Sequence, residues 1–274
     1  LLLLHTGREK RCREDGGGIL MHYGPKIVID SLIFNFDAGN DKCTDADDDL
    51  TSMRDIGSVE HSSRTDRSMH GDGITANISF PTDTGAVKAI NTGVTRRRSD
   101  DDPADPSNFE NRLDLDDNIL FADQDAWSME FWAKPDSDSE HTFLSLAGRG
   151  ATNNWMIWQQ GSTTWYPRYR DNNSNYYRDS ANTNVSGPDD WHQVVFTADT
   201  SRNIGFYVDG ALLGGTTQAA DTQASVTRLM AGYASGTSRY GFQGSMLCTR
   251  IYAKTLSAAE VLQNFNATRR RVGI

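Results

Sequence analysis

Residues 191–214, WHQVVFTADTSRNIGFYVDGALLG, contain the pattern that decides the fold. Two runs of strand-forming residues, 204–208 and 211–213, flank the pair Asp209-Gly210, which tolerates the positive φ angles of a type I′ turn. This spacing predicts a tight β-hairpin. The upstream run at 191–197 has the same strand-forming composition and predicts another strand.

Strand-type alternation continues on both sides of this hairpin. Near the N-terminus, a run at 27–29 is followed by Leu32, Phe34 and Phe36, whose period of two places them on one face of a strand. Further strands are expected at 128–133, 143–146 and 246–252.

One good helix signal appears, near the C-terminal end. Ser257 and Glu260 have the spacing of a capping box, and Leu256 is positioned to pack on Val261 or Leu262. Many short strands, 24 glycines and one trailing helix predict an all-β chain, an antiparallel β-sandwich of the jelly-roll type.

Composition excludes several classes of protein. The chain of 274 residues allows two small domains or one large all-β domain. A net charge of −10 and a pI near 5 argue against a nucleic-acid partner, because phosphate binding needs a basic surface. No run approaches the length of a membrane-spanning helix, so no membrane insertion is expected. Three widely spaced cysteines, Cys12, Cys43 and Cys248, form neither a disulfide framework nor a zinc motif, and Cys248 is expected to be a small buried hydrophobe.

The chain divides into three parts by composition. Residues 1–20 lack the apolar stretch of a signal peptide and are expected to be a non-native or disordered extension, with Met21 as the start. Residues 21–108 hold the first strand and an irregular, acidic, loop-rich region, either an interaction arm or an insert. Residues 109–274 form the sandwich core, completed by the strand at 26–40.

No catalytic residue is predicted. The sequence has no nucleophile elbow, phosphate-binding loop, HExxH or dinucleotide motif. Asp114 and Asp116 alternate without a second acidic strand, and Glu130 stands alone between apolar residues, so paired glycosidase carboxylates are not evident. The acidic run from Asp45 departs from a calcium-binding EF-hand loop, which needs Gly where Leu50 stands and Glu where Ile56 stands. The sequence therefore favours a protein that is not an enzyme.

The segment 155–178, WMIWQQGSTTWYPRYRDNNSNYYR, concentrates aromatic and arginine residues. Aromatic faces with nearby polar donors suit sugar rings, which makes five residues candidates for glycan binding: Trp165, Tyr166, Arg168, Tyr176 and Tyr177. The alternative is a hairpin turning at 171–174, with these aromatic side chains in the core or on a sheet face.

Four motifs in order resemble the laminin-G-like, concanavalin A-like jelly-roll family: SMEFWAKP at 128–135, WHQVVFTAD at 191–199, YVDG at 207–210, and the stretch 244–266. The ends at 26–40 and 263–274 resemble those of such domains in virion proteins of tailed phages. The resemblance implies a calcium ion near the end of the first strand, with Asp37 and Asn40 as candidate ligands.

The resemblance also implies a function. We expect a non-enzymatic virion structural protein of a tailed bacteriophage, made in the host cytoplasm: a surface, capsid-decoration or tail-associated component. Its expected partners are other virion proteins, copies of itself and host-surface glycans. The alternatives are a free or secreted carbohydrate-binding lectin or adhesion module, located outside the cell, and a glycan-cleaving enzyme.

Overall fold

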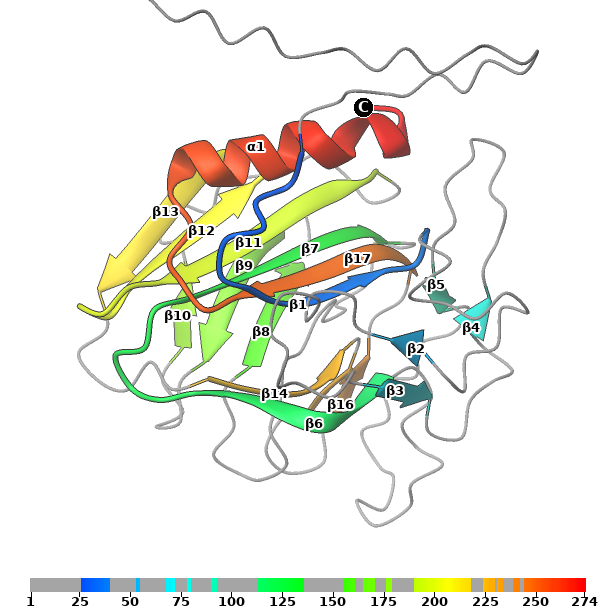
Figure 1. The fold of residues 1–274 in the computed structure, drawn as a ribbon, viewed down its shortest axis with the longest axis horizontal. Helices are drawn as coiled ribbons and strands as arrows, with labels where there is room; N and C mark the ends of the chain where they lie inside the picture. Colours follow the sequence, from blue (N-terminus) through cyan, green and yellow to red (C-terminus); the bar gives the residue numbers. More distant parts are fainter. Residues whose placement is uncertain are drawn as a thin grey trace, which may run out of the picture.

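The computed structural model describes residues 26–39, 113–135, 190–217 and 244–274, together with short strands between these ranges. Its main element is an eight-stranded sheet in the order β13-β12-β11-β7-β17-β5-β4, with β1 also paired to β17 (Figure 1). The bounds of these strands are β1 Leu32–Asp37, β4 Ile78–Ser79, β5 Ile90–Thr92, β7 Trp127–Pro135, β11 His192–Ala198, β12 Asn203–Val208, β13 Ala211–Thr217 and β17 Gly244–Tyr252.

In the part of the chain that the structure describes, three smaller sheets accompany the main one. The first has the order β14-β6-β3-β2, the second β10-β9-β8, and the third pairs β15 with β16. Their bounds are β2 Met53–Arg54, β3 Ser68–Gly71, β6 Leu113–Phe121, β8 Trp155–Gln160, β9 Trp165–Arg170, β10 Tyr176–Arg178, β14 Ala224–Leu229, β15 Ala231–Tyr233 and β16 Arg239–Gly241. Every strand pair that the structure describes is antiparallel, so the predicted all-β, jelly-roll sandwich is confirmed.

The main sheet lies between two layers. Helix α1, Ala258–Thr268, covers one face, and β6 and β14 lie on the opposite side in Figure 1. A short 3-10 turn, Arg269–Val272, follows the helix. No helix in the described part of the chain is long and apolar enough to cross a membrane.

The face of the main sheet opposite the helix is apolar. Alternate residues of adjacent strands form it, and these side chains are almost fully buried: Phe34, Phe36, Trp127, Met129, Phe131, Val194, Phe196, Phe206 and Ile251. Phe121 of β6 contacts Trp127 of β7 with ring centroids 6.3 Å apart. This contact joins the two layers through apolar side chains, as a sandwich core requires.

The predicted hairpin is confirmed in detail. Val208 pairs with Ala211, and the two residues between them have positive φ angles, 50° at Asp209 and 80° at Gly210. These angles are those of a type I′ turn, whose twist matches that of the flanking strands. His192 Nδ1 lies 2.8 Å from Asp209 Oδ2, and the Gln193 backbone N–H donates to Asp209 Oδ1 at 2.9 Å. The start of β11 therefore holds the turn in place.

The helix prediction is also confirmed. Ser257 is the N-cap, and both halves of the capping box with Glu260 are present. Leu256 and Val261 share one buried cluster with Val28 and Val195, while Leu262 is 47% exposed. Of the two partners expected for Leu256, Val261 is the one buried with it.

Two expectations about the first strand were wrong. Residues 27–29 form no strand, because the Val28 N–H donates to the side chain of Asn264 in α1 rather than to a neighbouring strand. Leu32 does not share a face with Phe34 and Phe36, because the register shifts between Leu32 and Phe34. This irregularity turns Leu32 toward the helix-side cluster.

Three other expectations concern the strand at 143–146, the domain boundaries and the burial of Cys248. The strand expected at 143–146 lies outside the described residues. The domain boundaries at 20 and 108 stay predictions, although β4 and β5 join the main sheet through β17, and β2 and β3 join the sheet of β6. Cys248 is fully buried, and burial raises the pKa of its thiol to about 12.

Candidate functional site

All five residues predicted to bind glycans lie in one small antiparallel sheet. Strand β9 is central, with β8 on one side and β10 on the other. Trp165, Tyr166 and Arg168 belong to β9, whereas Tyr176 and Tyr177 belong to β10. The pairing of Arg170 with Tyr176 places the connection between these two strands at 171–175, where the sequence predicts the turn.

The strand register divides this sheet into two different faces. Tyr166, Arg168 and Arg170 alternate along β9, and residues directly opposite them across the ladders belong to the same face. This face, called the basic face below, contains Trp155, Ile157, Gln159, Tyr166, Arg168, Arg170, Tyr176 and Arg178. The other, called the apolar face, contains Met156, Trp158, Gln160, Trp165, Pro167, Tyr169 and Tyr177.

The predicted candidates therefore do not form one set. Tyr166, Arg168 and Tyr176 lie on the basic face, but Trp165 and Tyr177 lie on the apolar face. The register places candidates on both faces, and the two interpretations of the aromatic segment, glycan binding and core packing, both stay predictions. Strand pairing was needed to assign the five candidates to two faces, because alternation along a single strand does not say which residues of the next strand share its face.

The basic face combines two kinds of group that recognise sugars. Arginine presents a planar fork of N–H donors that matches a carboxylate or sulfate group, and tyrosine and tryptophan present flat rings. The strands β8, β9 and β10 contain three arginines and no acidic residue, in a chain with a net charge of −10.

A buried polar network lies on the helix-covered face of the main sheet. Its centre is Glu130 of β7, which is 0% exposed and which the sequence showed only as a lone carboxylate. Glu130 Oε1 accepts hydrogen bonds from Trp132 Nε1 at 3.1 Å, Gln193 Nε2 at 2.9 Å and an Arg250 guanidinium nitrogen at 2.8 Å. Asn264 Nδ2 donates to Oε2 at 2.7 Å. With its charge paired and four donors in place, this carboxylate stabilises the fold and is not placed for acid–base chemistry.

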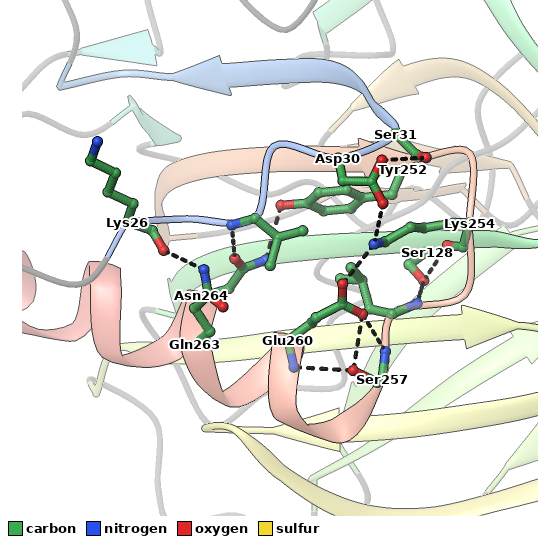
Figure 2. A network of polar contacts seen from close by, with 12 residues as sticks. Lys26, Asp30, Ser31, Ser128, Tyr252, Lys254, Ser257, Glu260, Gln263 and Asn264 are labelled. Carbon is green, nitrogen blue, oxygen red and sulfur yellow. Dashed lines mark hydrogen bonds and ion pairs between the residues drawn. The ribbon is translucent and has the colours of Figure 1, made fainter. Parts of the chain in front are cut away.

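Asn264 of α1 connects this network to the N-terminal segment (Figure 2). Its Oδ1 accepts from the Val28 N–H at 2.7 Å, and its Nδ2 also lies 2.9 Å from the hydroxyl oxygen of Tyr252. Burial, together with the negative charge of Glu130, raises the pKa of Tyr252 far above its ordinary value. Tyr252 therefore stays neutral inside the network.

A second group of contacts fixes the start of α1 (Figure 2). Lys254 Nζ lies 2.7 Å from Asp30 Oδ2 and 2.6 Å from Glu260 Oε1, so it joins the N-terminal segment to the first turn of the helix. The Ser128 hydroxyl donates to the Lys254 carbonyl and accepts from the Leu256 N–H, both at 2.8 Å. Burial alone would raise the pKa of Glu260, but hydrogen bonds from Lys254 and Ser257 outweigh it and lower that pKa.

The candidate calcium ligand Asp37 already binds a cationic side chain. Its two carboxylate oxygens lie 2.6 and 2.8 Å from the guanidinium nitrogens of Arg271, and the Gly39 N–H donates to it at 2.9 Å. Asn40 lies outside the described residues. Among the residues that are described, no three His, Cys, Asp or Glu side chains gather as a metal site would require. The calcium ion stays a prediction, and a cation at Asp37 would compete with Arg271.

Comparison with protein families identifies the superfamily to which this architecture belongs. A family model described as the concanavalin A-like lectin/glucanases superfamily, of the laminin-G type, matches residues 107–262, more than half of the chain. The chain belongs to this superfamily. The resemblance inferred from the sequence motifs is thereby confirmed for the family. A search of curated protein sequences finds no match.

The fold of this chain is also similar to that of solved structures. The chain is similar to Trypanosoma rangeli sialidase, with a TM-score of 0.52 and 12% identity over 89% of this chain and 34% of that chain. It is also similar to the binding domain of Paraclostridial mosquitocidal protein 1, with a TM-score of 0.51 and 13% identity over 87% of this chain and 52% of that one. The chain thus spans about a third and about half of these two structures. At such identities the likeness concerns the fold.

Proposed function

We propose that this concanavalin A-like chain is a carbohydrate-binding module and that the basic face of the β8–β10 sheet contacts the sugar. One observation carries the proposal: the register gathers Tyr166, Arg168 and Tyr176 on a single face, together with Trp155 and Gln159. Rings for stacking and polar donors for hydroxyl groups are the two components of a sugar site. The superfamily's name, which covers lectins, is consistent with this function.

Two neighbouring aromatic residues provide the test. Tyr166 lies on the basic face and Trp165 on the apolar face, so their alanine variants are matched in position but not in expected effect. Tyr166→Ala should weaken glycan binding about 10-fold, which corresponds to about 1.4 kcal/mol, with an unchanged melting temperature. Trp165→Ala, on the opposite face of the same strand, should leave glycan binding unchanged.

The measurement is binding to an array of immobilised polysaccharides, alongside thermal unfolding of each variant. Leu120→Ala is the control, because Leu120 lies in β6 and is 70% exposed. If wild-type protein binds no polysaccharide, the proposal is wrong. It is also wrong if Tyr166→Ala binds as well as wild type.

We propose further that the module binds without cleaving. Glu130, the carboxylate at the centre of β7, is buried and paired with Arg250, so it is not placed to act on a sugar. The superfamily's name also covers glucanases, which makes cleavage the competing function. Release of reducing ends from a bound polysaccharide, lost on replacing a carboxylate, would establish an enzyme instead.

The virion role is a narrower proposal that rests on the resemblance of the two ends of the sequence to phage proteins. Many weak sugar sites on one particle would act together through multivalency. Density-gradient sedimentation followed by mass spectrometry of the particle band tests this location. Protein found only in the soluble or exported fraction would favour a free lectin.

A further inference from the structure

We propose that the ligand of the basic face is an anionic glycan, one that carries carboxylate or sulfate groups, and that Arg168, Arg170 and Arg178 select it. This inference rests on the proposed sugar-binding function and adds the chemical class of the ligand. Three steps support it.

The first step is the arrangement of the three arginines. Arg168 and Arg178 are directly opposite each other across the β9–β10 ladder, and Arg170 is two residues from Arg168 along β9. Paired positions on adjacent strands are about 4.5–5.5 Å apart at the Cα atoms, and residues i and i+2 are about 7 Å apart. The three arginine positions are therefore close together on one face of the sheet.

The second step is the charge composition of the three strands. Two like charges directly opposite each other on a sheet destabilise it. The strands β8, β9 and β10 contain no Asp or Glu, and the nearest acidic residues in sequence, Asp171 and Asp179, come after the ends of β9 and β10. Although the chain has 37 acidic residues, two arginines, Arg168 and Arg178, occupy directly paired positions in these strands. An anionic ligand supplies the charge that offsets the repulsion, as expected where a local rule is broken at a functional site.

The third step separates a glycan from other polyanions. The basic face places Tyr166 and Tyr176 among the arginines, with Trp155 opposite Arg170 in β8. Acidic groups spaced by apolar sugar faces fit such a mixture of forks and rings. Nucleic acid fits less well, because the net charge of −10 repels a uniformly charged phosphate chain at long range.

The experiment measures binding of the full chain to four probes: polygalacturonate, chondroitin sulfate, uncharged galactan and double-stranded DNA. The variants Arg168→Gln, Arg170→Gln and Arg178→Gln are compared with Arg270→Gln, a charge-matched control at an exposed position near the C-terminus. We expect binding to at least one acidic polysaccharide, weakened about 10-fold by each basic-face variant and unchanged by the control. Rising salt should weaken this binding.

Other outcomes overturn the inference, and they can be told apart. Galactan bound as tightly as the acidic probes, with no effect of the arginine variants, contradicts anionic selection but leaves sugar binding intact. No binding to any polysaccharide contradicts the proposed function itself. DNA bound as tightly as the polysaccharides indicates a general polyanion surface. If a glutamine variant fails to fold, Arg168→Lys keeps the charge without the fork, and unchanged affinity there contradicts selection by arginine geometry.

Discussion

Replacing Glu130 by Gln should destabilise this protein strongly, although it changes one side chain by a single functional group. Glu130 is 0% exposed and its ion-pair partner Arg250 is 2% exposed, so the variant leaves a buried cation without its counter-charge. Removing one member of a buried ion pair costs about 3–5 kcal/mol.

The hydrogen bonds around Glu130 oppose any rescue by the new amide. Its carbonyl oxygen can replace Oε1, but its NH₂ group then meets Asn264 Nδ2, itself a donor at 2.7 Å from the carboxylate. Asn264 cannot reverse its amide, because its Oδ1 already accepts from the Val28 N–H at 2.7 Å. One buried donor therefore faces another, and an unsatisfied buried polar group costs about 1–3 kcal/mol by itself.

Denaturant unfolding of five proteins measures the effect: wild type, Glu130→Gln, Arg250→Met, the double variant and the control Asp190→Asn. The double variant removes the isolated charge, so it should be less destabilised than the sum of the single variants, with a coupling of about 1–3 kcal/mol. Asp190→Asn, at an exposed position, should change the free energy of unfolding by less than about 0.5 kcal/mol. A cost below about 1 kcal/mol for Glu130→Gln, or no coupling with Arg250→Met, would refute the reasoning.

Three further predictions concern the turn, the helix start and the buried thiol. In denaturant unfolding, Gly210→Ala should destabilise the protein more than Gly273→Ala. Both glycines have a φ of 80°. A Cβ added at Gly210 would lie 3.0 Å from Leu262 Cδ1, whereas a Cβ added at Gly273 would have no atom within 4 Å. Equal costs would mean that strain in the left-handed region alone decides the effect. Folding lowers the pKa of Glu260 below its ordinary value of 4.5. The ionised carboxylate therefore stabilises the folded protein above pH 4.5, and this contribution is lost as the pH falls through the pKa of Glu260 in the folded protein. The difference in free energy of unfolding between wild type and Glu260→Gln should therefore shrink from pH 7 to pH 3, and a constant difference contradicts the assignment. In a variant with Cys12→Ser and Cys43→Ser, Cys248 should react with a thiol reagent only when the protein unfolds, because burial raises the pKa of its thiol to about 12. Rapid labelling of the native protein would contradict this burial.

Local sequence signals predicted those parts of the fold that depend on neighbouring residues. The Asp209-Gly210 turn and the Ser257 capping box each need only a few adjacent residues, and both are present. The period of two also placed Phe34 and Phe36 correctly, because both lie within one regular strand.

Long-range contacts explain what the sequence did not reveal. Val28 bonds to Asn264, 236 residues later in the chain, so the apolar run at 27–29 gave a false strand signal. Glu130 and Arg250 are 120 residues apart, and only the pairing of β7 with β17 brings them together. The same holds for the candidate site, where the ladders of β9 with β8 and β10 place Tyr166 and Trp165 on opposite faces together with different residues of the neighbouring strands.

The central claim, that the basic face of β8–β10 binds the sugar, is tested most directly by backbone amide NMR during titration with the polysaccharide that binds. The account predicts shifts concentrated in 155–160, 165–170 and 176–178, with the resonances of α1 and the Asp209-Gly210 turn unchanged. Shifts concentrated elsewhere, with those three strands unaffected, would contradict it.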